Sequence, residues 1–163
     1  MIALLAAAAI SPTPQALLTK LLHTPIARAE LPSGYSKPKL ARQPLGANGK
    51  KYHAVGQVVV LLAGPSRQDA FAWEVFQTRK DALADLHHPA LTNGTRLVGT
   101  VPGVKDGVLL RGQVNGLALA DAVTVVDNVL VQAVTAAPQG NPAAAIALLK
   151  TAIAHLKKVT GSS

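Results

Sequence analysis

Histidine, serine and acidic residues that could act together in catalysis or bind a metal are scattered along this sequence. His87 and His88 are its only histidine pair, and neighbouring residues on a helix point about 100 degrees apart, which suits metal chelation poorly. Ser66 lies in Gly64-Pro65-Ser66, which resembles a turn and lacks the Gly-x-Ser-x-Gly pattern of a hydrolase nucleophile. The absence of Cys excludes thiolate ligands, disulfides and a Cys nucleophile. We predict no catalytic residues, no metal site and no cofactor.

The remaining histidines, His23, His53 and His155, have no Asp or Glu at a sequence spacing that would orient them. A carboxylate pair would likewise have to be assembled in space. The stretch 112–116 lacks the spacing of a phosphate-binding loop. These patterns favour a protein that is not an enzyme, and a small hydrolase with a spatially assembled site is the alternative.

The few aromatic side chains are the candidates for a ligand pocket. Phe71, Trp73 and Phe76 are close in sequence, and Tyr35 follows a Pro- and Gly-containing turn. Large rings contribute much of the contact area in ligand pockets, so we predict that these four residues line one. The alternative is that the rings simply fill the core.

The net charge of +8 comes mainly from the N-terminal third. Up to Lys51 there are seven basic residues against Glu30 alone, with Pro and Gly between them. The composition predicts an extended or flexible basic arm that contacts an anionic surface, or else a solvated linker. Binding of nucleic acid is disfavoured because the aromatic side chains have mainly apolar neighbours in the sequence. A surface on which nucleobases stack would instead have basic residues interleaved with the aromatic ones. The predicted anionic-surface contacts are Lys37, Lys39, Arg42, Lys50 and Lys51.

The start of the chain resembles the end of a secretion signal. Residues 2–10 are apolar and uncharged, and they lead into Ser11-Pro12-Thr13-Pro14. The alternative is an ordinary Ala-rich first helix. No run reaches the roughly 20 apolar residues of a transmembrane helix. We predict a signal-peptide remnant at 1–11, a helix and basic arm at 12–51, and a domain at 52–163.

Periodicity predicts helices and strands in alternation. Pro14 opens a helix that Pro25 ends, Thr78 caps a second, and Asn141 and Pro142 open a third. Asp127-Asn128 predicts a hairpin turn. The predicted strands are at 52–62, 71–77, 96–101, 107–114, 122–126 and 129–134. The fold class is α+β, with an antiparallel sheet of about five to six strands and helices packed on one face. Hairpin followed by helix occurs twice, which leaves an internal duplication open.

Several short motifs resemble small exported actinobacterial lipoproteins and sensor-like domains. They are the signal-like start, the segment Leu31-Pro32-Ser33-Gly34-Tyr35, the strand and helix Val75-Phe76-Gln77-Thr78 to Asp81-Ala82-Leu83, and the hairpin Asn128-Val129-Leu130-Val131. The resemblance implies binding of ligands or partners at the cell envelope and not catalysis. The chain departs from the lipoprotein pattern because it has no Cys to acylate.

The sequence-based hypothesis is therefore a non-catalytic, extracytoplasmic domain, secreted or at the cell envelope. It binds a small or lipid-like ligand between the sheet and its helices, or a protein partner. The alternatives are the small hydrolase and a cytoplasmic nucleic-acid-binding protein that uses the basic arm.

Overall fold

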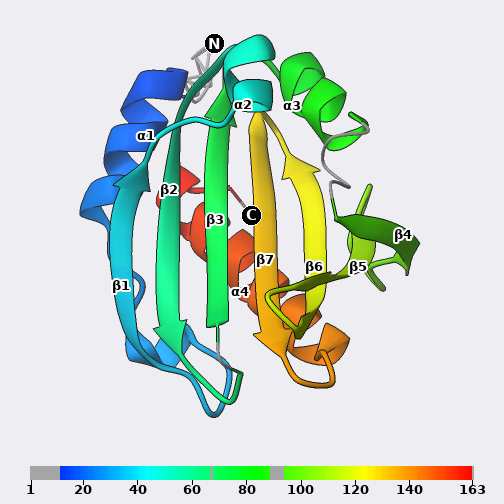
Figure 1. Cartoon of the computed structure of the whole chain (residues 1–163). Helices are drawn as coiled ribbons and strands as arrows, with labels where there is room; N and C mark the ends of the chain where they lie inside the picture. The colour runs from blue at the N-terminus through cyan, green and yellow to red at the C-terminus, as the bar shows by residue number, and fades with distance from the viewer. Residues whose placement is uncertain (1–11, 67, 89–93, 163) are drawn as a thin grey trace, which may run out of the picture.

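The computed structural model describes residues 12–66, 68–88 and 94–162. They form one seven-stranded antiparallel sheet in the order β1-β2-β3-β7-β6-β5-β4 (Figure 1). The predicted signal remnant at 1–11 lies outside the described residues. The strands are β1 (Ser36–Gln43), β2 (Ala54–Ala63), β3 (Gln68–Phe76), β4 (Thr95–Thr100), β5 (Val108–Val114), β6 (Leu117–Val126) and β7 (Val129–Ala137).

The helices divide unequally between the two faces of the sheet. The helices α1 (Pro14–His23) and α4 (Pro142–Thr160) pack on one face, behind the sheet in Figure 1. The shorter α2 (Ala47–Lys51) and α3 (Arg79–Leu86) lie at one end of the sheet, and α3 packs on its opposite face. The α+β class is confirmed, but the expectation that all helices share one face is wrong.

The strand beyond the predicted five to six is β1, which lies in the predicted basic arm. It pairs with β2 at the sheet edge, with Lys39 opposite Leu61 and Arg42 opposite Val58. This strand was not predicted because Pro38 and the basic residues around it are typical of a linker. An edge strand tolerates both, since one side of its backbone needs no partner and charged side chains discourage further pairing. Residues 12–51 thus supply a helix and a strand to the same sheet.

The main core lies between the sheet and the helices α1 and α4. Trp73 is at its centre, where the indole Nε1 donates to the carbonyl of Ala152 on α4 at 3.0 Å. Its ring contacts the edge of Phe71 at 5.1 Å between centroids. Burying a ring of this size with its N–H satisfied fixes α4 against the sheet.

The local signals of helix and turn are confirmed. Thr78 accepts from the backbone N–H of Asp81, and Asn141 accepts from that of Ala144. Asp127 has φ 52°, the left-handed conformation that the predicted hairpin turn between β6 and β7 requires. The two caps and the turn fix where α3, α4 and the hairpin begin.

The two hairpin–helix units meet where β3 pairs with β7. A two-fold axis through that antiparallel pair would leave both helices on one face, whereas α3 and α4 pack on opposite faces. The repeat of element order is therefore not a repeat of three-dimensional structure.

Candidate ligand-binding groove

An open groove of about 690 Å³ runs between the C-terminal half of α4 and strand β6. Its size lies within the range of small-molecule sites. One wall is α4, the floor is β6, and the other wall is the loop between β4 and β5. The lining residues are Arg79, Gly103, Val104, Lys105, Thr124, Val125, Val126, Asp127, Lys150, Ile153, Ala154 and Lys157.

The loop wall is held in place by hydrogen bonds. The buried Thr124 Oγ1 donates to the carbonyl of Lys105 at 2.7 Å, which ties the loop to β6. Within the loop, the N–H of Val104 donates to the carbonyl of Val101 and that of Gly107 to Val104. A Cβ at Gly107 would lie 2.9 Å from that of Val101, so only glycine fits this close approach. These hydrogen bonds and the close packing at Gly107 hold the wall in the conformation that forms the groove.

Three lysines in the groove are interspersed with apolar side chains from both walls and the floor. Lys150 and Lys157 lie seven residues apart on α4, and Lys105 comes from the loop opposite. All three are exposed and form no ion pair within the described part of the chain. Between them lie the apolar side chains of Val104, Val126, Ile153 and Ala154. The groove thus offers unpaired positive charge next to apolar surface.

Arg79, the fourth base, is already engaged. Its Nη2 donates to Asp106 at 3.1 Å, and its Nη1 lies 3.4 Å from the carbonyls of Val125 and Asp127. These contacts join the start of α3 to the loop and to the β6–β7 turn. The carboxylate of Asp127 is the one acid among the described lining residues. Arg79 therefore supports the groove, and the lysines carry its free positive charge.

A second cavity of about 490 Å³ lies beyond the β6–β7 turn and shares Arg79, Val126 and Asp127 with the groove. It is lined by both ends of the described chain, Pro12 and Ser162, and by no lysine. It therefore lacks the three unpaired lysines of the groove.

The four predicted ligand-binding rings lie in the core. Their exposed fractions are 6% for Tyr35, 1% for Phe71, and 0% for Trp73 and Phe76. Strand alternation turns Phe71 and Trp73 toward α4, whereas Phe76 packs beneath α3 on the other face. None of the four lines the groove. In this structure they fill the core.

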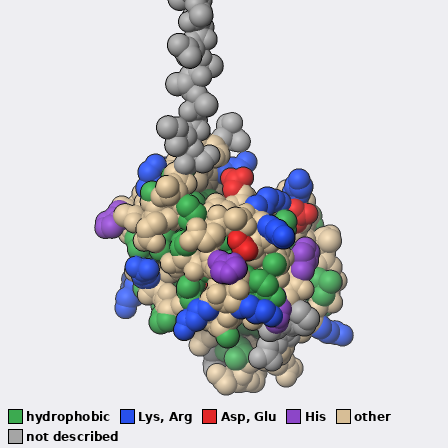
Figure 2. Space-filling view, turned by 90° about the horizontal axis from the view of Figure 1, so that it is seen from above, with side chains coloured by type: hydrophobic (Ala, Val, Ile, Leu, Met, Phe, Trp, Pro, Cys, Tyr) green, Lys and Arg blue, Asp and Glu red, His purple; other side chains and the backbone are tan. Residues whose placement is uncertain are grey.

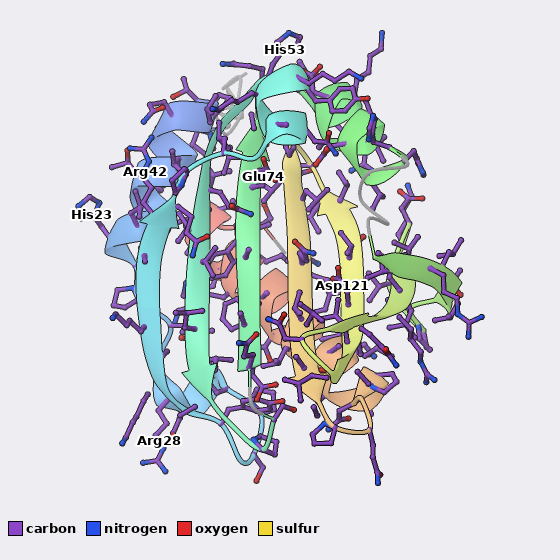
Figure 3. The ribbon with its side chains drawn as sticks, in the orientation of Figure 1. His23, Arg28, Arg42, His53, Glu74 and Asp121 are labelled. Carbon is purple, nitrogen blue, oxygen red and sulfur yellow. The ribbon has the colours of Figure 1, made fainter. Side chains whose placement is uncertain are left out.

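The five predicted anionic-surface contacts are exposed on β1 and α2. Figure 3 places Arg42 on the β1 edge. In the view of Figure 2, onto the end where α2 and α3 lie, basic side chains are interspersed with acids and histidines and form no continuous patch. Three of these bases thus lie on the edge strand β1 and two on α2 at the end of the sheet, and none of them lines the groove.

In the structure, two histidines that have no acidic residue at a suitable spacing in the sequence lie next to an acidic side chain. His155 Nδ1 lies 3.2 Å from Glu30 Oε1, and His53 Nδ1 lies 3.4 Å from Asp81 Oδ1. Neither histidine lines the groove. His155 is fully buried, with its Nε2 3.0 Å from the carbonyl of Thr24 and its ring against Trp73, so it ties α4 to the N-terminal segment. Among the described residues no group of three His, Asp or Glu side chains could hold a metal ion.

Three buried acids, Glu74, Asp85 and Asp121, lie on the opposite face of the sheet from α4. Burial, together with the charge of Asp85, raises the pKa of Glu74 to about 7. Burial raises the pKa of Asp121 to about 7 against the opposing hydrogen bond from Gln132 Nε2. In Figure 3 Glu74 and Asp121 are well separated on the sheet, whereas Asp85 of α3 is close enough to Glu74 to contribute to the rise in its pKa. Glu74 and Asp121 do not form a paired site.

The fold that carries the groove is that of an α+β domain with an antiparallel sheet backed by two helices. It is similar to the extracellular domain of PknH from Mycobacterium tuberculosis, with a TM-score of 0.52, 15% sequence identity, and coverage of 83% of this chain and 99% of that one. At this identity the likeness is one of fold. No protein-family model matches the chain, and no curated protein matches its sequence. No helix in the described part of the chain is long and apolar enough to cross a membrane.

Sequence reasoning missed the groove because its residues come from four separate segments. The one available signal was on α4, where Lys150 and Lys157 share a face with Ala154. Lys105 and Thr124 have no recognisable signal in the sequence, because only the folded loop brings them together.

Proposed function

We propose that this protein is an exported, non-catalytic domain that binds a small or lipid-like ligand in the groove between α4 and β6. The observation that carries the proposal is the groove itself, a cavity of about 690 Å³ with a hydrogen-bonded wall and three unpaired lysines. It lies between the sheet and a helix, where the sequence-based hypothesis places the ligand. Its concave form favours a small molecule over the alternative of a protein partner.

Two observations support export. Residues 2–10 have the composition and length of a signal-peptide apolar region. The fold is similar to that of a domain that is extracellular in another protein. The location that we propose is extracytoplasmic, either secreted or at the cell envelope.

The bases of β1 and α2 have a separate role in this proposal. Three of them are exposed on the edge strand β1 and two on α2 at the end of the sheet, and none lines the groove: Lys37, Lys39, Arg42, Lys50 and Lys51. Exposed bases attract anionic surfaces through long-range Coulomb interaction. We assign them to contact with an anionic surface at the envelope.

A hydrolase is not favoured by any specific observation. Catalysis would need a His–acid pair beside a cavity that admits a substrate. His155 is fully buried, and the His53–Asp81 pair lines none of the three cavities of about 460 to 690 Å³.

The test begins with the intact mass of the protein from the extracytoplasmic and cytosolic fractions of its native host. Export predicts a truncated species outside the cytosol, and a full-length species confined to the cytosol would contradict it. Native mass spectrometry of the isolated protein then detects any small molecule that copurifies. We expect Ala154→Trp, which fills the groove, to lose that molecule. Ala143→Trp, at an exposed alanine of the same helix outside the groove, should keep it. Equal retention by both variants would contradict the proposed site.

A further inference from the structure

We infer that the ligand of this groove is an anionic amphiphile, a single acyl-type chain with a carboxylate or phosphate head. The inference rests on the proposed function and specifies the chemistry of its ligand. Three features of the groove carry it: the place of its charges, the place of its apolar surface, and the absence of aromatic rings from its described lining.

The charges face one another across the groove. Lys150 and Lys157 extend from α4, and Lys105 from the loop opposite. An ammonium group is a compact donor with three N–H bonds, which suits the oxygens of a carboxylate or phosphate. Asp127 offsets one of the three charges, and Asp106 is occupied by Arg79. The remaining positive charge selects an anionic head over a neutral or cationic one.

The apolar surface lies between the charges and along the floor. Ile153 and Ala154 on α4 face the groove with Val104 of the loop and Val126 of β6. A free phosphate or a small organic acid would leave this surface in contact with water, whereas an acyl chain would cover it. Burial of each methylene is favourable, so affinity should rise with chain length.

Other anionic ligands fit less well. Single-stranded nucleic acids bind largely through stacking of their bases on aromatic rings, and no Phe, Tyr or Trp is among the described residues that line the groove. A phosphate group alone is held by convergent backbone N–H groups at a glycine-rich loop or helix start. Here α4 turns its side chains, and not its N-terminus, toward the groove.

The experiment is isothermal titration calorimetry of the full chain with soluble amphiphiles below their micelle concentrations. Dodecanoate should bind, and affinity should fall by about two- to fourfold for each methylene removed on going to octanoate. A dodecyl chain with a maltoside or trimethylammonium head, and inorganic phosphate, should bind at least tenfold more weakly. Equal binding of all three dodecyl compounds would overturn the inference, because it would show no selection of charge.

Two variants locate the binding. Lys150→Glu combined with Lys157→Glu should lower dodecanoate affinity at least tenfold. Lys20→Glu combined with Lys80→Glu makes the same change in net charge at exposed sites outside the groove, and should change affinity less than twofold. Equal losses in both would overturn the inference. Ala154→Trp should abolish binding while its circular dichroism spectrum and melting temperature match those of Ala143→Trp.

The last arm separates a free amphiphile from a membrane headgroup. In this arm the protein is sedimented with phosphatidylglycerol vesicles. If the protein binds the vesicles, Ala154→Trp does not weaken that binding, and dodecanoate does not bind, the inference is overturned in favour of membrane-surface contact. If no anionic amphiphile binds but a different molecule copurifies and is lost from Ala154→Trp, the inferred ligand class is wrong and the proposed function is supported. If no amphiphile binds and no copurifying molecule is lost from Ala154→Trp, both the ligand class and the proposed function are wrong.

Discussion

Buried charged groups set how single residues of this protein respond to pH. Glu30 Oε2 accepts from the backbone N–H of Ala27 at 2.7 Å, and its Oε1 faces His155 and Lys158. Partial burial works against ionisation, but these hydrogen bonds lower the pKa of Glu30 to about 2 from 4.5. Both nitrogens of His155 face acceptors, so the ring donates to both only when each nitrogen carries a proton.

Glu30→Gln tests this contact. Because the folded pKa of Glu30 is depressed, its contribution to stability is complete above about pH 4.5 and is lost as the pH falls toward 2. At pH 6 we expect the variant to be less stable by about 1 to 3 kcal/mol, with the difference shrinking below pH 4. Urea unfolding at several pH values measures this. Asp127→Asn removes an exposed carboxylate without an ion pair and serves as control. A constant difference across that range would contradict the assignment.

The contribution of Asp121 to stability depends on pH in the opposite direction to that of Glu30. It is 4% exposed, and its Oδ1 has no hydrogen-bond partner within the described residues. Since its pKa is raised to about 7 from 3.8, its contribution to stability is full below pH 3.8 and is lost as the pH rises to 7. Asp121→Asn should therefore stabilise the protein at pH 8 by about 2 to 4 kcal/mol and much less near pH 4. Thermal unfolding at both pH values checks this, and a smaller gain at pH 8 than at pH 4 would refute it.

At the scale of elements, the start of α4 determines how Lys150 and Lys157 are presented. Asn141 caps the helix by accepting from the N–H of Ala144 at 3.0 Å. Asn141→Ala should cost about 1 kcal/mol, and Asn141→Asp, which keeps the acceptor, should cost little. Chemical unfolding followed by circular dichroism compares the two. Equal losses would mean that the cap does not depend on the side-chain oxygen.

Helices and turns that are marked by a capping or turn residue could be predicted from the sequence, and elements that have no such residue could not. Thr78, Asn141 and the Asp127-Asn128 turn act on neighbours within a few residues, so the sequence displays them. Strand β1 has no such signal because its partner β2 supplies its order. Among site residues, sequence cannot decide whether the four rings line a pocket, because it does not distinguish a ring that fills the core from one that lines a cavity. The Glu30–His155 contact joins residues 125 positions apart and is visible only in the fold.

At the scale of the whole molecule, the two sheet edges differ in their neighbours. The β1 edge carries Lys39 and Arg42, and at the other edge Arg96 of β4 lies opposite Arg111 of the neighbouring strand β5. If β1 contacts an anionic surface, Lys39→Gln with Arg42→Gln should weaken binding to phosphatidylglycerol vesicles about tenfold at low salt. Arg96→Gln with Arg111→Gln removes the same charge from the opposite edge and should have much less effect. Equal losses in vesicle sedimentation would assign the binding to net charge.

The pairing of β3 with β7 also bears on how quickly the molecule can form. It places Val75 opposite Val129 and Gln68 opposite Ala136, and it unites the N-terminal and C-terminal halves of the sheet. Before β7 has been synthesised, β3 has one open backbone edge and Trp73 lacks the carbonyl of Ala152. Loop closure over such a sequence separation is slow compared with hairpin formation. The rate of folding should therefore depend on this single closure, and a chain emerging from its N-terminus would remain incomplete until α4 follows.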